Sequence, residues 1–332
     1  MNLPPNSVEW PPVIDWVDVP FEVPGQSDGL RLDAFLAARL RRYSRAEVQR
    51  LIDAGRVEAG TSHPKPSRRV RSGERIVVRY PRRDEGPVRH SVLPVLYEDE
   101  ALLAVDKPGD LLSHPTDKVH KNTATAVMAA QAPGVGLRLV HRLDRETSGV
   151  LLFAKDAAAA RSLVAQFSLR RTRKEYLALA AGEAAFSRRT VDEPIGREGG
   201  AIKVRQAVAE RGAGQAARTE FERLGVGGGI SLIRARPGTG RLHQIRVHLA
   251  WLGHPVLGDK LYTGGGEAYM KAVRKELCAE DIALLGAPRQ MLHAWKLAFE
   301  HPMTGRPVEV VAPLPADFCS RMGSAGIDWN PR

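Results

Sequence analysis

The chain has 332 residues, of which 43% are hydrophobic, and its formal net charge is +11. This length exceeds one typical domain and provides enough apolar residues for a sizeable core, so two domains are expected. No apolar run approaches the roughly 20 residues that span a bilayer, and the N-terminus does not resemble a secretion signal, which predicts a cytoplasmic protein without a membrane partner. The two cysteines, Cys278 and Cys319, are isolated, which suits a reducing compartment.

Positive charge is concentrated near the N-terminus. Residues 1–26 are rich in proline and are expected to form an N-terminal extension. Residues 30–83 then hold 15 Lys or Arg and 5 Asp or Glu, a balance of +10. A basic run is often only a solvated face, but this density in a folded pattern indicates contact with phosphates.

The basic segment has the pattern of a small folded domain, expected over residues 27–82. Apolar residues recur at helical spacing over 32–40, and Ser44 with Glu47 matches a capping box that opens a second helix. Short apolar runs after these helices predict small strands, which gives a small α/β-loop domain. Four arginines fall outside the apolar positions and are expected to bind RNA: Arg41, Arg42, Arg45 and Arg50. A linker rich in Pro, Gly and mixed charge follows at 83–92.

The larger domain, expected over 93–318 and followed by a C-terminal tail at 319–332, has many strands and few helices. Short apolar or alternating runs predict strands at 101–105, 149–154, 175–180, 218–223, 230–235, 292–299 and 307–311. Helical spacing occurs at 123–131, 157–168, 241–252 and 267–285. This order predicts an α+β domain on a mixed, mainly antiparallel β-sheet.

The most informative stretch is HRLDRETSGVLLFAK, residues 141–155. One acid, Asp144, stands among the basic residues His141, Arg142 and Arg145, before turn residues and a buried apolar run. The pattern fits a structural ion pair at a strand end, which is the commoner case, or a catalytic carboxylate kept ionised by nearby cations. Charge spacing alone does not separate these interpretations.

The order of the residues adds a resemblance. The stretch resembles the signature loop of the RluA-type pseudouridine synthases, which act on large-subunit ribosomal RNA and whose HRLD aspartate is catalytic; here that residue is Asp144. The resemblance runs colinearly over about residues 93–318, through further segments at 97–116, 170–182, 237–262 and 289–315. The basic segment resembles the S-four-like RNA-binding domain, first known from a small-subunit ribosomal protein. The resemblance implies the pseudouridine synthase fold.

The resemblance also implies roles for other residues. Arg246, in HQIR, would pair with Asp144, although phosphate contact is an alternative for it. Tyr176 would stack on the uracil and relay a proton. The alternative is that Tyr176 only packs in the core, which is the ordinary role of a tyrosine in a strand. Arg142 would fill the space left by an extruded base. Four more residues are expected to contact RNA phosphates or to pack: Lys107, Lys174, Arg241 and His243.

The function implied is the isomerisation of specific uridines to pseudouridine, with large-subunit ribosomal RNA or its assembly precursor as partner. The reaction requires no cofactor and no metal, and a monomer is expected. Asp144 can act as nucleophile or as base, and the sequence leaves both open. Two rivals are a non-catalytic ribosome-binding or assembly factor and an RNA methyltransferase. The Gly-rich stretches at 225–229 and 264–266 lack a cofactor-loop pattern, which counts against the second.

Overall fold

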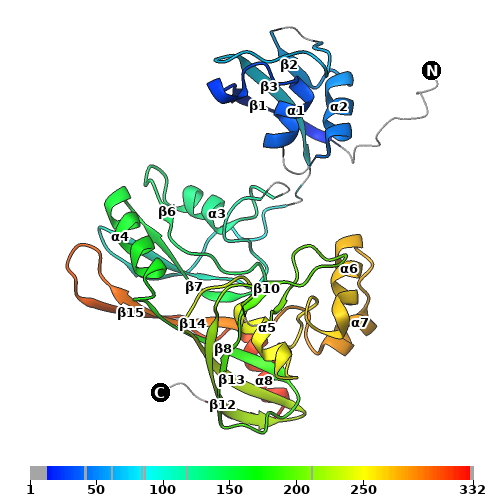
Figure 1. Cartoon of the computed structure of the whole chain (residues 1–332). Coiled ribbons are helices and arrows are strands. Elements are labelled where there is room, and N and C mark those ends of the chain that lie inside the picture. The colour runs from blue at the N-terminus through cyan, green and yellow to red at the C-terminus, as the bar shows by residue number, and fades with distance from the viewer. Residues whose placement is uncertain are drawn as a thin grey trace. The chain divides into compact units, whose positions relative to one another are not determined.

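The computed structural model describes residues 13–40, 43–60, 63–83, 85, 87–116, 119–210 and 212–329. The chain divides into two compact units, Met1–Gly86 and Pro87–Arg332 (Figure 1). Within the described parts of both units, every helix is too short or too polar to cross a membrane.

The small unit packs two helices on a three-stranded antiparallel sheet of order β1-β3-β2. Its elements are β1 (Val13–Glu22), the 3-10 turn η1 (Gly25–Ser27), α1 (Leu32–Arg39), α2 (Arg45–Asp53), β2 (Val57–Ala59) and β3 (Arg75–Arg83). The predicted capping box is confirmed, because Ser44 Oγ accepts the Glu47 amide and Glu47 Oε2 accepts the Ser44 amide at 2.7 Å. Phe35, Leu36 and Ile76 lie in the hydrophobic core of this unit.

Strand β1 lies in the stretch that the sequence analysis set apart as an extension. It pairs with β3 from Val13 opposite Arg83 to Glu22 opposite Arg75. Proline weakens the strand pattern here, since Pro20 has no amide hydrogen to donate. A proline is tolerated because β1 is an edge strand. The pairing also covers one edge of β3, which would otherwise be open.

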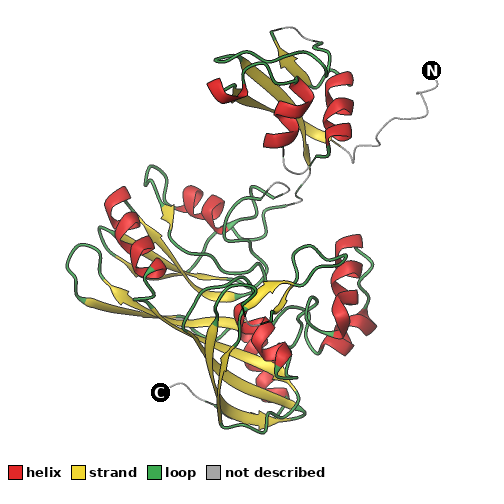
Figure 2. Ribbon diagram, in the orientation of Figure 1, coloured by secondary structure: helices red, strands yellow, loops and turns green. Residues whose placement is uncertain are grey.

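The large unit is built on a ten-stranded sheet of order β4-β5-β7-β14-β8-β13-β12-β9, with β6 beside β7 and β15 beside β14 (Figure 2). The strands are β4 (Val95–Glu98), β5 (Leu102–Lys107), β6 (Arg138–Leu139), β7 (Ser148–Ala154), β8 (Arg173–Ala181), β9 (Arg188–Asp192), β12 (Arg218–Gly227), β13 (Ile230–Pro237), β14 (Leu292–Glu300) and β15 (Pro307–Val311). Strands β7 and β14 are parallel, and the other described pairs in this sheet are antiparallel. The predicted α+β class is therefore confirmed. A separate hairpin joins β10 (Ile195–Arg197) to β11 (Gln206–Val208).

Neighbouring residues of a strand point to opposite faces of the sheet, and in this sheet both faces carry apolar side chains. Helices cover both faces. The helices are α3 (Ala124–Gln131), α4 (Ala157–Ser168), α5 (Gln244–Trp251), α6 (Glu267–Arg274), α7 (Ala279–Leu285) and α8 (Ala316–Ser324), with a 3-10 turn η2 (Gly264–Gly266) before α6. Helix α4 packs on the face of Leu152, and α3 on the face of Phe153. Helix α5 packs on the face of Ala178, and α8 on the face of Leu177.

Two C-terminal details differ from the sequence-based expectation. The single helix expected over 267–285 is two helices, because Lys275 adopts a left-handed backbone conformation (φ 64°) that ends α6. Helix α8 extends into the expected tail at 319–332, and there Met322 and Ile327 are buried against the sheet. Short amphipathic segments of this kind have weak periodicity, so only the packed structure shows that they belong to the core.

Gly149 permits the close approach of the parallel strands β7 and β14. Its φ is 108°, and a Cβ there would collide with the carbonyl oxygen of Ala294. We expect Gly149→Ala to lower the free energy of unfolding by about 3–4 kcal/mol in a urea titration. The control Gly134→Ala also has positive φ (81°) but meets no described atom within 4 Å; it should cost about 1–2 kcal/mol of backbone strain. Equal losses in both variants would contradict the packing argument.

Candidate active site

A small hollow opens where the loop before β7 meets β8 and the start of α5. Its volume is about 130 Å³. A cavity of about 150 Å³ holds a benzene ring, so this volume suits one heterocyclic ring. Its lining brings together seven of the residues singled out from the sequence: Arg142, Asp144, Lys174, Tyr176, Arg241, His243 and Arg246.

Asp144 begins a tight turn. The amide of Thr147 donates to the carbonyl of Asp144 at 3.1 Å, a position in turns that aspartate favours. The preceding residue, Leu143, is fixed on both sides by Ser113, whose hydroxyl donates to its carbonyl (2.8 Å) and accepts from its amide (3.0 Å). The Asp144 side chain is 27% exposed, so it remains accessible from the hollow. Ser113 was not expected as a supporting residue, because nothing in the local sequence links it to the loop.

Arg246 joins Asp144 to a second carboxylate. From α5, its Nη1 donates to Asp144 Oδ2 at 2.7 Å, while Nε and Nη2 donate to Asp259 at 2.6 and 2.9 Å. Asp259 is fully buried and also accepts the amides of Leu261 and Tyr262. The sequence analysis missed Asp259; a signal was available in the aspartate of LGDKLY, inside a segment that carried the family resemblance.

The protonation state of Asp144 follows from these neighbours. Burial raises the pKa of its carboxyl, but the charge of Arg246 and the hydrogen bonds from Arg246 and Gln290 outweigh burial and hold the pKa below its ordinary value. The carboxylate is therefore ionised near neutral pH. Burial disfavours the charged form of Arg246 as well, but Asp259 and Asp144 raise its pKa overall, so the guanidinium stays charged.

The basic residues beside Asp144 in the sequence do not supply this charge. His141 accepts the amide of Leu152 (3.1 Å), and burial lowers its pKa to about 3, so the ring is neutral. Arg142 is exposed and contacts His114 at 2.8 Å, and Arg145 donates to the carbonyl of Asp110. None of these three residues forms the ion pair with Asp144, and Arg246 provides the counter-charge instead.

Tyr176 reaches the hollow from β8, where it lies opposite Ala235 of β13 and Ala294 of β14. Burial, and then the charge of Asp144, raise the pKa of its hydroxyl well above the ordinary value. The hydroxyl therefore keeps its proton, and the ring forms one wall of the hollow.

Two other residues fix the rim. Lys174 donates to the carbonyl of Thr239 at 3.3 Å, and burial lowers its pKa. Arg241 donates to the carbonyl of Ala216 at 3.0 Å. Both side chains thus combine a backbone contact with a place at the mouth of the hollow.

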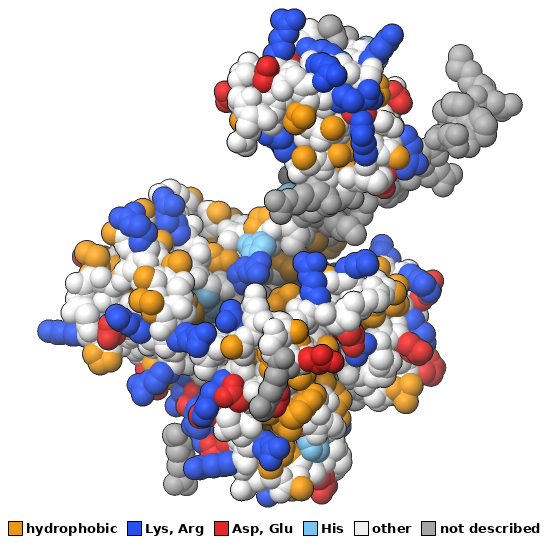
Figure 3. Space-filling model, in the orientation of Figure 1, with side chains coloured by type: hydrophobic (Ala, Val, Ile, Leu, Met, Phe, Trp, Pro, Cys, Tyr) orange, Lys and Arg blue, Asp and Glu red, His pale blue; other side chains and the backbone are white. Residues whose placement is uncertain are grey.

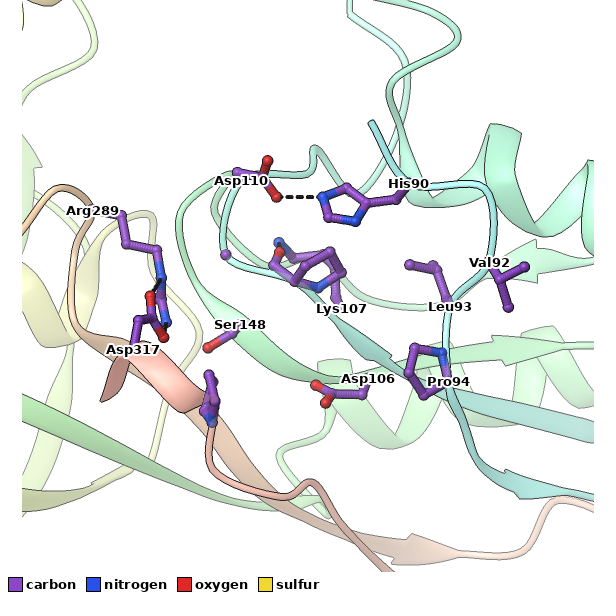
Figure 4. Close-up of a pocket in the computed structure, with 13 residues that line it drawn as sticks. His90, Val92, Leu93, Pro94, Asp106, Lys107, Asp110, Ser148, Arg289 and Asp317 are labelled. Carbon is purple, nitrogen blue, oxygen red and sulfur yellow. Dashed lines mark hydrogen bonds and ion pairs between the residues drawn. The ribbon is translucent and has the colours of Figure 1, made fainter. Parts of the chain in front are cut away.

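Lys107 lies elsewhere, in the lining of a separate hollow of about 590 Å³ (Figure 4). Its side chain is fully buried, and its Nζ donates to the carbonyls of Pro108, Leu111 and Arg145 at 2.7, 2.7 and 3.1 Å. Burial lowers its pKa to about 7. The expected phosphate contact does not fit this position, since every donor direction is used inside the protein. Lys107 instead supports the backbone next to Asp144.

The larger hollow also shows a second support of the loop. Arg289 faces Asp317 in a two-point ion pair (2.6 and 2.7 Å) and donates to the carbonyl of Glu146 at 3.1 Å (Figure 4). This hollow contains none of the residues that line the smaller one. The smaller hollow is the candidate active site because it holds the ionised carboxylate of Asp144 and the guanidinium of Arg246 that is paired with it.

Figure 3 shows Lys and Arg side chains on the visible face of the small unit. Arg50 is exposed, whereas Arg45 contacts the fully buried Asp33 at 3.1 Å. Arg41 and Arg42 lie outside the described residues. Arg31 and Gln49 bind the same carboxylate, so part of the positive charge holds the domain together.

Comparisons with known proteins place the chain among RNA-modifying relatives. The family model described as RNA pseudouridylate synthase matches residues 101–251, and the S4 domain model matches residues 30–76. The chain is 35% identical over 302 residues to ribosomal large subunit pseudouridine synthase D of Xanthomonas campestris, covering 89% of each chain. It is 34% identical over 307 residues to the protein of that name from Pseudomonas aeruginosa, covering 91% of this chain and 92% of that one.

Solved structures show the same similarity. Human RNA Pseudouridylate Synthase Domain Containing 1 superposes with a TM-score of 0.56 at 30% identity, covering 70% of this chain and 87% of that chain. Human RNA Pseudouridylate Synthase Domain Containing 4 gives a TM-score of 0.57 at 25% identity, covering 72% and 95%.

The arrangement predicts how Asp144 responds to loss of its partner. In Arg246→Met the cation is gone while burial remains, so the pKa of Asp144 should rise from below to above the ordinary aspartate value. Carboxyl ¹³C NMR titration of the full chain measures this. Arg241→Met, which removes another guanidinium from the same hollow, is the control and should leave the titration in place. An unchanged Asp144 titration in Arg246→Met would show that the ion pair does not set its charge.

Proposed function

The chain belongs to the RNA pseudouridylate synthase family and is an RNA pseudouridine synthase, an isomerase; from this premise we propose that it modifies uridines of large-subunit ribosomal RNA with Asp144 as the catalytic carboxylate. The observation that carries the proposal is the 2.7 Å pair of Arg246 and Asp144 inside a hollow sized for one ring. An ionised carboxylate held by a fixed cation is preorganised for attack or proton removal at a sugar.

The reaction breaks one bond and forms another within the same nucleotide. The bond between uracil N1 and ribose C1′ breaks, the base turns, and C5 bonds to C1′; C5 loses a proton and N1 gains one. Asp144 acts on the ribose, as nucleophile at C1′ or as base, and needs its ionised form in both routes. Arg246 keeps that form and orients it.

Tyr176 and the small hollow keep the base in place between these steps. The ring of Tyr176 offers a stacking surface to the uracil, and its hydroxyl, protonated because burial raises its pKa, is available to relay the C5 proton. A hollow of about 130 Å³ holds little water beside a base. This limits hydrolysis of the broken glycosidic bond.

The uridine must leave its stack to enter the hollow. Arg142 is suited to fill the vacated space, because it is exposed at the hollow and its contact with His114 is on the surface. Lys174, Arg241 and His243 line the same entrance, and Lys174 and Arg241 can meet the phosphates beside the flipped nucleotide.

Two observations support large-subunit ribosomal RNA, or its assembly precursor, as the target. The small domain matches an RNA-binding family and carries a +10 balance over residues 30–83. Several relatives are named as large-subunit synthases, including those of Xanthomonas campestris and Pseudomonas aeruginosa. Pseudouridine mapping of ribosomal RNA, with and without the protein, tests the target directly.

Asp144→Asn keeps the size of the side chain but removes its charge. We expect single-turnover pseudouridine formation to fall at least roughly 1,000-fold, with folding and RNA affinity nearly unchanged. Asp110→Asn is the matched control. It changes another aspartate of the large unit, which pairs with His90 and does not line the smaller hollow. Near-normal turnover in Asp144→Asn would defeat the assignment.

The small domain should contribute affinity rather than chemistry. Replacing Arg41, Arg42 and Arg50 with Glu should weaken binding to long structured RNA and flatten the slope of log affinity against log salt by about 0.7–0.9 per lost phosphate contact. Arg45 is left intact because it holds the buried Asp33. Single-turnover rates on a short RNA that presents the uridine should survive. An equal salt slope in both proteins would show that these arginines do not meet the substrate.

A further inference from the structure

His243 has an unusual backbone for its position. It precedes α5 with φ 58° and ψ 17°, a left-handed conformation that only two other non-glycine residues adopt among those described. Such strain costs of order 1–3 kcal/mol and concentrates at functional sites. The side chain is 12% exposed and lines the hollow beside Asp144. The proposed mechanism so far gives its ring no role.

The ring of His243 is held from one side by a chain of hydrogen bonds. The amide of Gln206, in β11, donates to Tyr262 Oη at 3.1 Å, and Tyr262 Oη lies 2.9 Å from His243 Nδ1. The two rings meet edge to face, with centroids 5.7 Å apart. On its other side, Nε2 lies 4.0 Å from Asp144 Oδ2, the oxygen that also accepts from Arg246.

These contacts favour one position for the proton of the ring. Tyr262 Oη already accepts from Gln206, and its hydroxyl keeps its proton because burial raises its pKa far above neutral, so that proton is available to donate to Nδ1. The imidazole is neutral, since burial and then Arg246 lower its pKa to about 4, against the opposite effects of Asp144 and Asp259. A neutral ring that accepts at Nδ1 carries its proton on Nε2. That N–H faces the carboxylate.

We propose that His243 is a positioning residue for Asp144, with a neutral Nε2–H that donates to Asp144 Oδ2 in the RNA-bound enzyme. The inference rests on the proposed function of Asp144. A separation of 4.0 Å is too long for a hydrogen bond, and contacts of this kind often shorten only in the substrate complex. A second donor on the oxygen held by Arg246 stops the carboxylate from rotating. Because the ring is uncharged, it orients Asp144 without neutralising it.

The alternative for His243 is phosphate contact or simple packing, and two substitutions separate these roles. Gln places an amide donor near the position of Nε2, whereas Asn reaches only to the position of Nδ1. Asn tolerates a left-handed backbone better than Gln. If His243 has only a structural role, His243→Asn should be the more stable and the more active variant. If His243 is a hydrogen-bond donor, His243→Gln should be the more active variant although it is less stable.

The first experiment compares both variants in single-turnover assays at saturating RNA. His243→Asn should lower the rate roughly 10- to 100-fold, as is typical when an outer partner of a functional group is lost, with RNA affinity unchanged. His243→Gln should retain more of the rate although it is the less stable protein. If the Asn variant equals or exceeds the Gln variant, or if only RNA affinity changes, the proposal is overturned.

The second experiment observes the proton itself and does not depend on turnover. Long-range ¹H–¹⁵N NMR of the full chain without RNA should show the Nε2–H form of His243 from about pH 5 to 8. Tyr262→Phe removes the donor to Nδ1, so the share of the Nδ1–H form should rise and the rate should fall. An imidazolium or an Nδ1–H ring in the unsubstituted protein overturns the proposal. Failure of the wild-type enzyme to form pseudouridine would count against the proposed function instead.

Discussion

The proposed active site depends on one guanidinium that holds two carboxylates. Arg246 is 7% exposed, and a charge so deeply placed costs several kcal/mol unless it is paired. The buried Asp259 offsets that cost and takes two of the donors of Arg246, which leaves Nη1 aimed at Asp144. Asp259 also accepts the Tyr262 amide, so the same carboxylate fixes the arginine and the tyrosine that contacts His243. Breaking the Arg246–Asp259 pair would therefore disturb Arg246 directly and His243 through Tyr262.

The turn that carries Asp144 is held by segments far away in the sequence. Lys107 reaches its backbone from the end of β5, Ser113 from the segment after β5, and Arg289 from the segment before β14. Lys260 adds an ion pair with Glu146 at 2.8 Å. Most of these donors end on backbone carbonyls, which constrains the path of the loop without competing for the Asp144 carboxylate. The close approach of β7 to β14 at Gly149 then fixes where the loop ends.

Charge and chemistry are divided between the two units. The +10 balance of residues 30–83 accounts for nearly all of the +11 of the chain, so the remaining residues are close to neutral. Within the small unit, Asp33 binds Arg31 and Arg45, and Glu74 binds Arg68 at 2.6 Å. These pairs stabilise the domain, and they make the set of arginines available to RNA smaller than the residue count indicates.

Local sequence determined much of this protein. Alternating and helical apolar spacing predicted the strands and helices that flank the site, and the capping box at Ser44 followed from nearest-neighbour contacts alone. Asp144, Tyr176 and Arg246 were identified as candidates by the family resemblance of the motifs that contain them. The nearby cations His141 and Arg145 misled, because spacing along a chain does not show which way a side chain points after a sharp turn.

Tertiary structure alone decided what surrounds each candidate. Arg246 meets Asp144 across 102 positions of sequence, and Ser113 and Asp259 support the site from segments with no local link to it. The neutrality of His243 and the burial of Lys107 depend on desolvation, which appears only when distant strands pack. The physical reason is that protonation and orientation are set by contacts through space, whereas the sequence specifies order along the chain.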